Sequence, residues 1–231
     1  MEENFILPRI QEEHTVDAMI VMGEISREYI HFMKKHTDVP VIFLDFYDKE
    51  LAKDAVIADN FYGMYLMTGY LFEQGFTKMA YVGSIHATSS IMDRYCGFYK
   101  AQLEHGQVLP EEWLIEDRDE KGYMDIKLPQ HMPEAFVCNC DLAAGMLIQE
   151  LEKQGYRVPE DISVVGFDNY LYPGVTDKNI TSYEVNIQVM VKVALEKALK
   201  QIKNPDSGRG LSIVSGKIVE KESVQKICRE S

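Results

Sequence analysis

Three charged side chains stand where strand-like runs give way to loops and helices. Asp45 follows the apolar run 39–44, and Asp168 ends the strand-like run 161–168. Arg94 lies early in a helix-like segment, beyond a polar loop that follows another strand-like run. In doubly wound α/β sheets, ligands bind just beyond the carboxyl ends of the strands. Carboxylates accept hydrogen bonds and a guanidinium offers two parallel donors, so we expect these residues to converge on one cleft that binds a small polar molecule.

Other roles compete with that interpretation. An aspartate after a strand is commonly a turn or cap residue, and Arg94 fits a surface ion pair about as well as a ligand contact. Asp117, Asp119 and Glu120 could form a carboxylate cluster for acid–base work, but a solvated charged loop is the expected arrangement.

The sequence lacks signatures of catalysis and of cofactor binding. It has no GxSxG, Walker, GxGxxG or HExxH motif. Cys138 and Cys140 lack the two-residue spacing and the second pair of a zinc site, so a buried pair of small apolar residues is expected. We therefore predict that the protein is not an enzyme and that it holds neither a metal nor a cofactor.

Strand-like and helix-like segments alternate along almost the whole chain, which predicts an α/β fold with parallel sheets and helical crossovers. The expected strands are 18–22, 39–44, 56–58, 79–82, 113–115, 135–138, 161–168, 211–214 and 217–219. The expected helices are the tail 8–14 and the segments 26–35, 59–75, 90–106, 141–155 and 186–203. Their expected amino-terminal caps are Ser26, Asp59 with Asn60, Ser90, Asp141 and Asn186.

Composition and charge narrow the function. The 231 residues carry a formal net charge of −13, and such an acidic chain repels phosphate backbones. These residues by themselves are therefore not expected to bind DNA or RNA. No run is as apolar as a membrane helix, residues 1–9 do not resemble a secretory signal, and four scattered cysteines do not form a disulfide framework. We expect a cytoplasmic protein without a membrane partner.

Short motifs follow one another in order along nearly the whole chain: VDAMIVMG (16–23), VPVIFLD (39–45), DN..G (59–63), DR..GF (93–98), the run 140–143, VPEDISVVGFDN (158–169) and ITSY (180–183). The run 158–169 is the most specific, and the others are weak singly but strong together. In these motifs the chain resembles the effector-binding domain of the LacI/GalR family of bacterial transcription regulators.

The resemblance implies two Rossmann-like lobes of the periplasmic-binding-protein-like type I fold, joined by three crossings. One lobe would comprise residues 1–58 plus 185–217, and the other 59–184 plus 218–231. The effector would lie between the lobes and bias a hinge that repositions a separate DNA-binding headpiece. The headpiece, the hinge helix and the first strand–helix–strand have no counterpart here. We therefore expect an N-terminally incomplete first lobe, with Met1 inside a larger ancestral domain or at the start of a fragment.

The resemblance also assigns ligand-binding residues. By motif position these are Asp45 in the first lobe, the pair Ser90 and Arg94 in the second, Asp168 after the GF strand, and Asp117 at a variable specificity position.

Two positions depart from the family pattern. Cys140 stands where many members have an asparagine, and Val185 replaces a residue that is commonly polar at the second crossing. Both are expected to line a less polar cleft, which argues against a standard hexose.

The resulting hypothesis is an effector-sensing domain that binds a sugar or a related small polar molecule. Homodimerisation is expected from family habit and from the exposed-looking loop 170–173, and operator DNA would be contacted only through a headpiece outside this chain. The alternative is a sugar-binding receptor of a transport system, which shares the fold but predicts a secretory or lipoprotein signal upstream. If the effector-sensing hypothesis is correct, we expect Arg94→Ala and Asp168→Asn to abolish the response to the ligand and to leave the unliganded fold intact.

Overall fold

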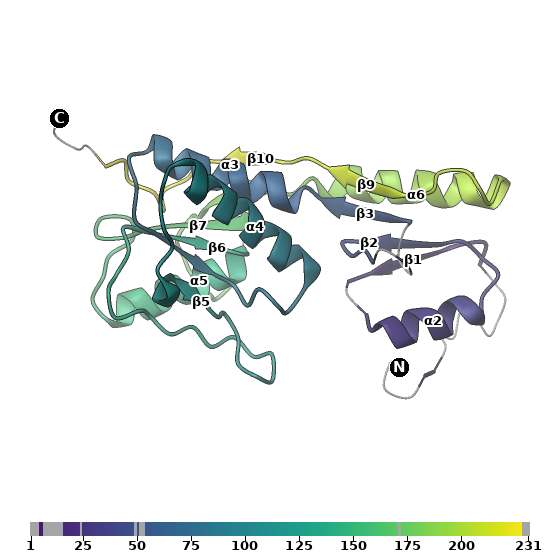
Figure 1. The fold of residues 1–231 in the computed structure, drawn as a ribbon, viewed down its shortest axis with the longest axis horizontal. Helices are drawn as coiled ribbons and strands as arrows, with labels where there is room; N and C mark the ends of the chain where they lie inside the picture. Colours follow the sequence, from purple (N-terminus) through teal and green to yellow (C-terminus); the bar gives the residue numbers. More distant parts are fainter. Residues whose placement is uncertain are drawn as a thin grey trace. The chain divides into compact units, whose positions relative to one another are not determined.

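The computed structural model describes residues 5–6, 16–23, 25–48, 50, 54–170 and 172–227 (Figure 1). The helix tail expected at 8–14 lies outside these residues. The chain divides into two compact units, and each is built from separate stretches of sequence. The first unit is Met1–Ala58 with Asn186–Val214, and the second is Asp59–Val185 with Ser215–Ser231.

A six-stranded sheet forms the centre of the second unit. Its order is β10-β8-β7-β6-β4-β5, and all pairs are parallel except β10 with β8. The antiparallel edge strand was not expected from the alternating pattern. The strands are β4 (Met79–Val82), β5 (Leu114–Ile115), β6 (Ala135–Cys138), β7 (Ser163–Asp168), β8 (Thr181–Glu184) and β10 (Lys217–Val219).

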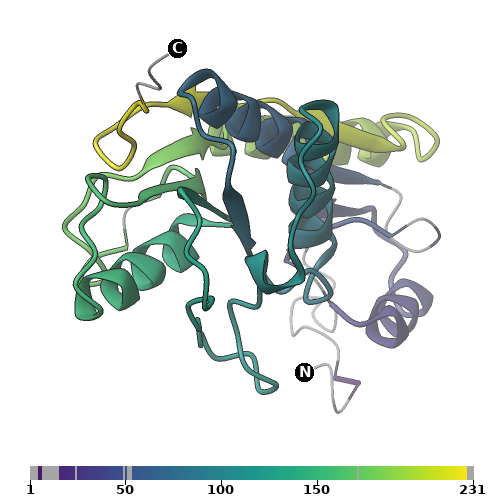
Figure 2. The same cartoon turned by 60° about the vertical axis from the view of Figure 1, so that its left-hand side comes forward.

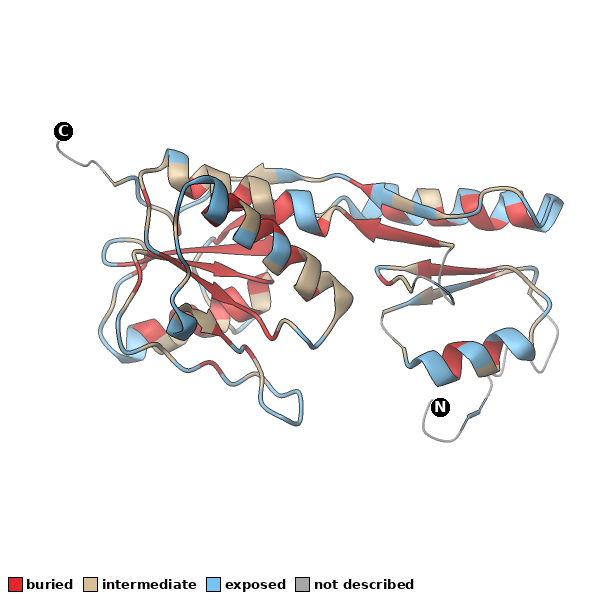
Figure 3. Ribbon diagram, viewed as in Figure 1, coloured by how far each residue is buried: buried red, intermediate tan, exposed pale blue. Residues whose placement is uncertain are grey.

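Helices cover both faces of this sheet, which explains why its central strands are apolar on both sides (Figure 3). α3 (Asn60–Glu73) and α4 (Ser89–Glu104) pack on one face, against Tyr81, Val137 and Phe167. α5 (Asp141–Lys153) packs on the other face, together with alternate strand residues (Figure 2). The helices and the sheet therefore form three layers.

The first unit has a four-stranded parallel sheet in the order β1-β2-β3-β9. α2 packs on one face through Ile30 and Met33, and α6 packs along the strands on the other face. None of the described helices is long and apolar enough to cross a membrane. The elements are β1 (Met19–Met22), α2 (Arg27–Lys35), β2 (Val41–Leu44), β3 (Ala55–Ala58), α6 (Ile187–Lys203) and β9 (Leu211–Val214).

Three of the expected helix caps are confirmed. The side chains of Ser26, Asp59 and Asn186 each accept a hydrogen bond from the backbone N–H three residues later. This contact satisfies one of the donors that the first turn of a helix leaves without a partner.

Two expected caps are wrong by one or two residues. Thr88, not Ser90, caps α4 by accepting from the Ile91 N–H at 3.2 Å. Cys140, not Asp141, caps α5, because its Sγ accepts from the N–H of Ala143 at 3.5 Å. A thiol is a weak acceptor, and cap propensity therefore pointed to the stronger neighbouring oxygen.

Close backbone contact joins α3 and α4. A Cβ added at Gly97 of α4 would lie 2.0 Å from the carbonyl oxygen of Phe61 and 2.9 Å from the backbone nitrogen of Tyr65, both in α3. Backbone atoms cannot yield as a flexible side chain can. The absence of a side chain at Gly97 therefore sets how closely the two helices approach each other.

We expect Gly97→Ala to lower the free energy of unfolding by about 1–3 kcal/mol or more, because it overpacks this contact. Chemical unfolding followed by far-UV circular dichroism measures the change. Gly69→Ala in α3 is the matched control, because a Cβ at Gly69 meets nothing within 4 Å. There, removing a glycine from a helix should stabilise the fold by about 0.5–1 kcal/mol. Equal effects of the two changes would contradict the packing argument.

Candidate functional site

Arg94 is the centre of a buried polar cluster in the second unit. Its side chain is 7% exposed, and its Nε donates to Asn60 Oδ1 at 2.8 Å. A terminal nitrogen donates to the carbonyl oxygen of Asn139 at 2.7 Å, and the other lies 3.3 Å from Asp168 Oδ1. The guanidinium also stacks on Phe167, 4.0 Å from the ring centroid. Helix α4 and strands β6 and β7 thus place one cation beside the carboxyl ends of the strands.

Asp168 occupies an unusual backbone conformation at the end of β7. Its φ is 99° and that of Asn169 is 54°, both in the left-handed region that non-glycine residues rarely adopt. Hydrogen bonds hold the turn, because the Asn169 N–H donates to Ser182 Oγ at 3.0 Å and its side chain bonds to Glu184 and Lys221. A conformation of this kind persists only where its surroundings determine it, and such residues are often functional.

Asp141 also holds this turn in place, through hydrogen bonds to both of its carboxylate oxygens. One carboxylate oxygen accepts from Ser182 Oγ and the other from the N–H of Tyr170, each at 2.7 Å. Gly166 makes room for this carboxylate, because a Cβ there would lie 2.0 Å from Asp141 Oδ1. Burial raises the pKa of Asp141 to about 7, although both hydrogen bonds act to lower it. Asp141 therefore supports the loop that presents Asp168.

Asp117 is fully buried, so the prediction of a solvated charged loop is wrong at this residue. Its carboxylate accepts from Ser84 N–H, from Asn139 Nδ2 and from two nitrogens of Arg118. Burial acts to raise its pKa, but these donors outweigh burial and the pKa is lower than usual. Protein donors occupy both oxygens, so Asp117 orders the neighbouring segments rather than presenting an open acceptor. A cavity of about 1010 Å³ borders this cluster at Ser84 and Arg118.

Cys140 and Ser90 lie close to the Arg94 cluster. Burial raises the pKa of the Cys140 thiol to about 11, and the charges of Asp168 and Arg94 also act on it. Ser90 is one turn before Arg94 on α4, and its hydroxyl lies 3.0 Å from Thr88 Oγ1. Cys140 is therefore a neutral, weakly polar side chain in this environment.

Asp45 and Val185 are each described within their own unit. Asp45 belongs to the first unit, where it is exposed after β2 with a φ of 60°. Val185 follows β8 and is half-buried against the apolar layer under α3. The structure thus brings together Arg94, Asp168, Cys140 and Ser90 of the predicted set. The ligand roles of all seven predicted residues stay predictions.

Asn60, Asn139 and Asp141 were not predicted as part of the site. Asn60 had a signal, because an amide in the first turn of a helix after a strand lies at the sheet edge. Asn139 directly follows β6 and had the same signal. Within the described residues, no group of three or more His, Cys, Asp or Glu side chains could hold a metal ion. The arrangement can orient and hydrogen-bond a small polar molecule.

The raised pKa of Asp141 predicts how stability depends on pH. The folded protein binds the Asp141 proton more tightly than the unfolded chain does, so this contribution is complete below the unfolded pKa of about 4. It is lost as the pH rises through about 7. Relative to Asp141→Asn, we expect the parent to lose up to about 1.4 kcal/mol of unfolding free energy per pH unit between these values. Chemical unfolding of both proteins over this range measures the difference, and parallel pH profiles would contradict the assignment.

Comparison with known proteins identifies the family. The sequence model of one protein family, the periplasmic binding protein-like domain, matches residues 68–224. A transcriptional repressor named PurR from Vibrio vulnificus is 29% identical over 225 residues, which cover 95% of this chain and 67% of the repressor. Its namesake from Aliivibrio salmonicida is 27% identical, with 95% and 68% covered. The chain therefore spans about two thirds of the length of these relatives.

Solved structures share the fold. A LacI-type regulator from Bacillus cereus matches with a TM-score of 0.78 and 20% identity, covering 95% of this chain and 80% of that one. A LacI family regulator from Enterococcus faecium, with bound ribose, has the same TM-score and identity, with 98% and 86% covered. The α/β periplasmic-binding-protein-like fold predicted from the motifs is confirmed. Because the family model matches well over half of the sequence, the chain belongs to the periplasmic binding protein-like domain family, in its LacI/GalR branch.

Proposed function

We propose that this chain is the effector-sensing domain of a LacI/GalR-type transcriptional regulator, and that Arg94 and Asp168 contact the effector. The observation that carries the proposal is the pairing of a buried guanidinium with a partly exposed carboxylate at the carboxyl ends of parallel strands. Ligands bind at this edge in open α/β sheets. The names of the curated relatives support a regulator over the alternative, a solute-binding receptor of a transport system.

The chemistry of the cluster favours a hydroxylated effector. The side chain of Asp168 is 29% exposed and offers an acceptor, while Arg94 offers donors held in place by Asn60 and Asn139. Adjacent hydroxyl groups donate to a carboxylate and accept from a guanidinium. One regulator of the same fold has bound ribose and another is in complex with cellobiose. The low polarity of Cys140 argues for a ligand with an apolar portion.

A binding role also fits what surrounds the cluster better than catalysis does. The thiol of Cys140 has a raised pKa, and Asp117 is saturated by protein donors, so neither is an activated nucleophile or a free base. In the proposed role the chain works in the cytoplasm, forms a homodimer and contacts operator DNA only through a headpiece outside this sequence. Tyr170, which is 56% exposed, belongs to the loop expected at the dimer contact.

Because Arg94 is buried and hydrogen-bonded, Arg94→Ala is a poor variant for testing ligand binding. The expectation that Arg94→Ala leaves the unliganded fold intact is not compatible with its burial. Removing the side chain would leave Asn60 Oδ1 and the Asn139 carbonyl without their donor and open space beside Phe167. Asp168 is the better position for testing ligand binding, because its side chain is partly exposed and Asp168→Asn keeps the size of the side chain.

We expect sugars and sugar-like molecules screened against the purified chain, beginning with D-ribose and cellobiose, to include a ligand that raises its melting temperature. At about 100 times the Kd the free energy of unfolding rises by about 2.7 kcal/mol. Asp168→Asn should remove the shift, because the charged acceptor is lost. Thermal denaturation with and without ligand measures both effects.

Glu160→Gln is the control variant for this experiment. Glu160 is an exposed carboxylate before the amino end of β7, whereas Asp168 lies at the carboxyl end of the same strand. The control should respond to the ligand like the parent. If Asp168→Asn also responds like the parent, the effector does not bind at this cluster.

A further inference from the structure

The ion pair between Arg94 and Asp168 joins a buried cation to a carboxylate that lies nearer to solvent. The side chain of Arg94 is 7% exposed and that of Asp168 is 29% exposed, with 3.3 Å between the guanidinium and Oδ1. A molecule that approaches this pair from solvent therefore meets the carboxylate before the guanidinium.

Asp168 is the charged partner of Arg94, and the other partners are neutral. Nε donates to the side-chain oxygen of Asn60, Nη1 donates to the backbone carbonyl of Asn139, and the ring of Phe167 covers one face of the guanidinium. Among the residues that the structure describes, no other carboxylate lies within ion-pair distance of Arg94. The compensation of this buried positive charge therefore depends on one side chain.

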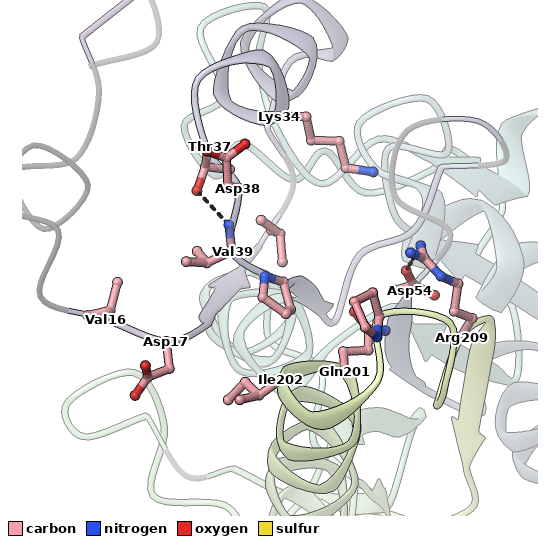
Figure 4. A pocket seen from close by; sticks show the side chains of 13 residues that line it. Val16, Asp17, Lys34, Thr37, Asp38, Val39, Asp54, Gln201, Ile202 and Arg209 are labelled. Carbon is pink, nitrogen blue, oxygen red and sulfur yellow. Dashed lines mark hydrogen bonds and ion pairs between the residues drawn. The ribbon is translucent and has the colours of Figure 1, made fainter.

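An ion pair in the first unit has the opposite arrangement. Asp54 and Arg209 lie in the wall of a cavity of about 430 Å³ (Figure 4). Their side chains approach to 3.1 Å, but here the guanidinium is 56% exposed and the carboxylate is 12% exposed. Water can solvate Arg209 if its partner is removed, whereas Arg94 has little access to water. Of these two guanidinium groups, that of Arg94 is the one that requires an internal anion.

The neutral pair limits which ligands fit beside it. An acidic ligand would place its negative charge next to Asp168, and a ligand with an ammonium group would place its positive charge next to Arg94. Like charges a few ångström apart in a partly buried site repel each other strongly. The neighbouring cation Arg118 is already paired with Asp117, and so it does not provide a separate anion site. Hydroxyl groups can donate to the carboxylate and accept from the guanidinium without adding a charge.

We propose that Asp168 acts as the internal counter-ion of Arg94 and thereby restricts the effector to uncharged polyhydroxylated molecules. Sugar acids, sugar phosphates and amino sugars are excluded. This inference rests on the proposed function, because it concerns the same ligand site. It also makes Asp168 a determinant of specificity in addition to a ligand contact.

The first test compares neutral sugars with their charged derivatives in the parent chain. D-ribose is paired with D-ribonate and D-ribose 5-phosphate, cellobiose with cellobionate, and D-glucose with D-glucosamine. Any further sugar that raises the melting temperature is compared with its charged derivatives in the same way. We expect the neutral member of a pair to bind at least about tenfold more tightly, because the charged member meets a like charge. Isothermal titration calorimetry measures both dissociation constants.

The second test does not need the effector. Asp168→Ala removes the counter-ion and leaves space of carboxylate size beside Arg94, which an acetate ion can occupy. We expect this variant to melt below the parent, and acetate to raise its melting temperature with saturation at constant ionic strength. Acetamide, which has the same shape without the charge, should have no effect, and the parent should not respond to acetate. If the variant is unfolded without acetate, the folded fraction regained on adding acetate, followed by far-UV circular dichroism, is the readout.

Asp54→Ala is the matched control for the second test. It removes the carboxylate partner of Arg209 beside an existing cavity, so space for acetate is present there too. Acetate should not stabilise this variant with saturation, because water already solvates the exposed guanidinium. An equal response of Asp54→Ala and Asp168→Ala would contradict the role of burial.

The outcomes separate this inference from the proposed function. A parent chain that binds a charged sugar as tightly as its neutral counterpart would overturn the restriction to uncharged effectors and leave the sensing role intact. An Asp168→Ala variant that acetate does not stabilise would overturn the counter-ion role. A parent that binds no sugar of either kind, while acetate still stabilises Asp168→Ala, would overturn the proposed function and with it the restriction.

Discussion

Burial of the Arg94 guanidinium is the constraint on which the candidate site depends. A buried cation is strongly destabilising unless hydrogen bonds and an opposite charge replace the water it loses. Here an amide oxygen from α3, a carbonyl oxygen after β6 and the carboxylate after β7 supply them, and Phe167 covers one face. Each partner comes from a different element, so the arginine ties α3, α4 and two strands to a common geometry.

Further hydrogen bonds connect the residues around Arg94 to the neighbouring loops. Asn139 uses its carbonyl oxygen for Arg94 and its side-chain amide for Val82 and Asp117, and Asp117 in turn holds Arg118 and Ser84. Through this chain of contacts, the loops after β4, β5 and β6 are connected. This hydrogen-bonded network holds the side chains around Arg94 in place before a ligand binds, which lowers the conformational entropy lost on binding.

Much of the fold was predictable because its signals are local. Strand β7 and its terminal carboxylate follow from the apolar run within 161–168, and the carboxyl ends of parallel strands meet at one edge. The burial of Asp117 was not predictable, because a charged loop reads as solvated until Ser84, Asn139 and Arg118 are known to surround it. The cap by Cys140 was missed for a related reason. Local preference favours a carboxylate oxygen of Asp141 as the cap, but the tertiary hydrogen bonds from Ser182 and Tyr170 engage both of its oxygens.

The contact between Gly166 and the carboxylate of Asp141 has an evolutionary consequence. A Cβ at Gly166 collides with Asp141 Oδ1, so a larger residue in the strand becomes acceptable only after the helix has exchanged its aspartate for a smaller side chain. The reverse order passes through a badly packed intermediate. The two positions are therefore epistatic, and sequence drift at the end of β7 can proceed along one mutational path and not the other.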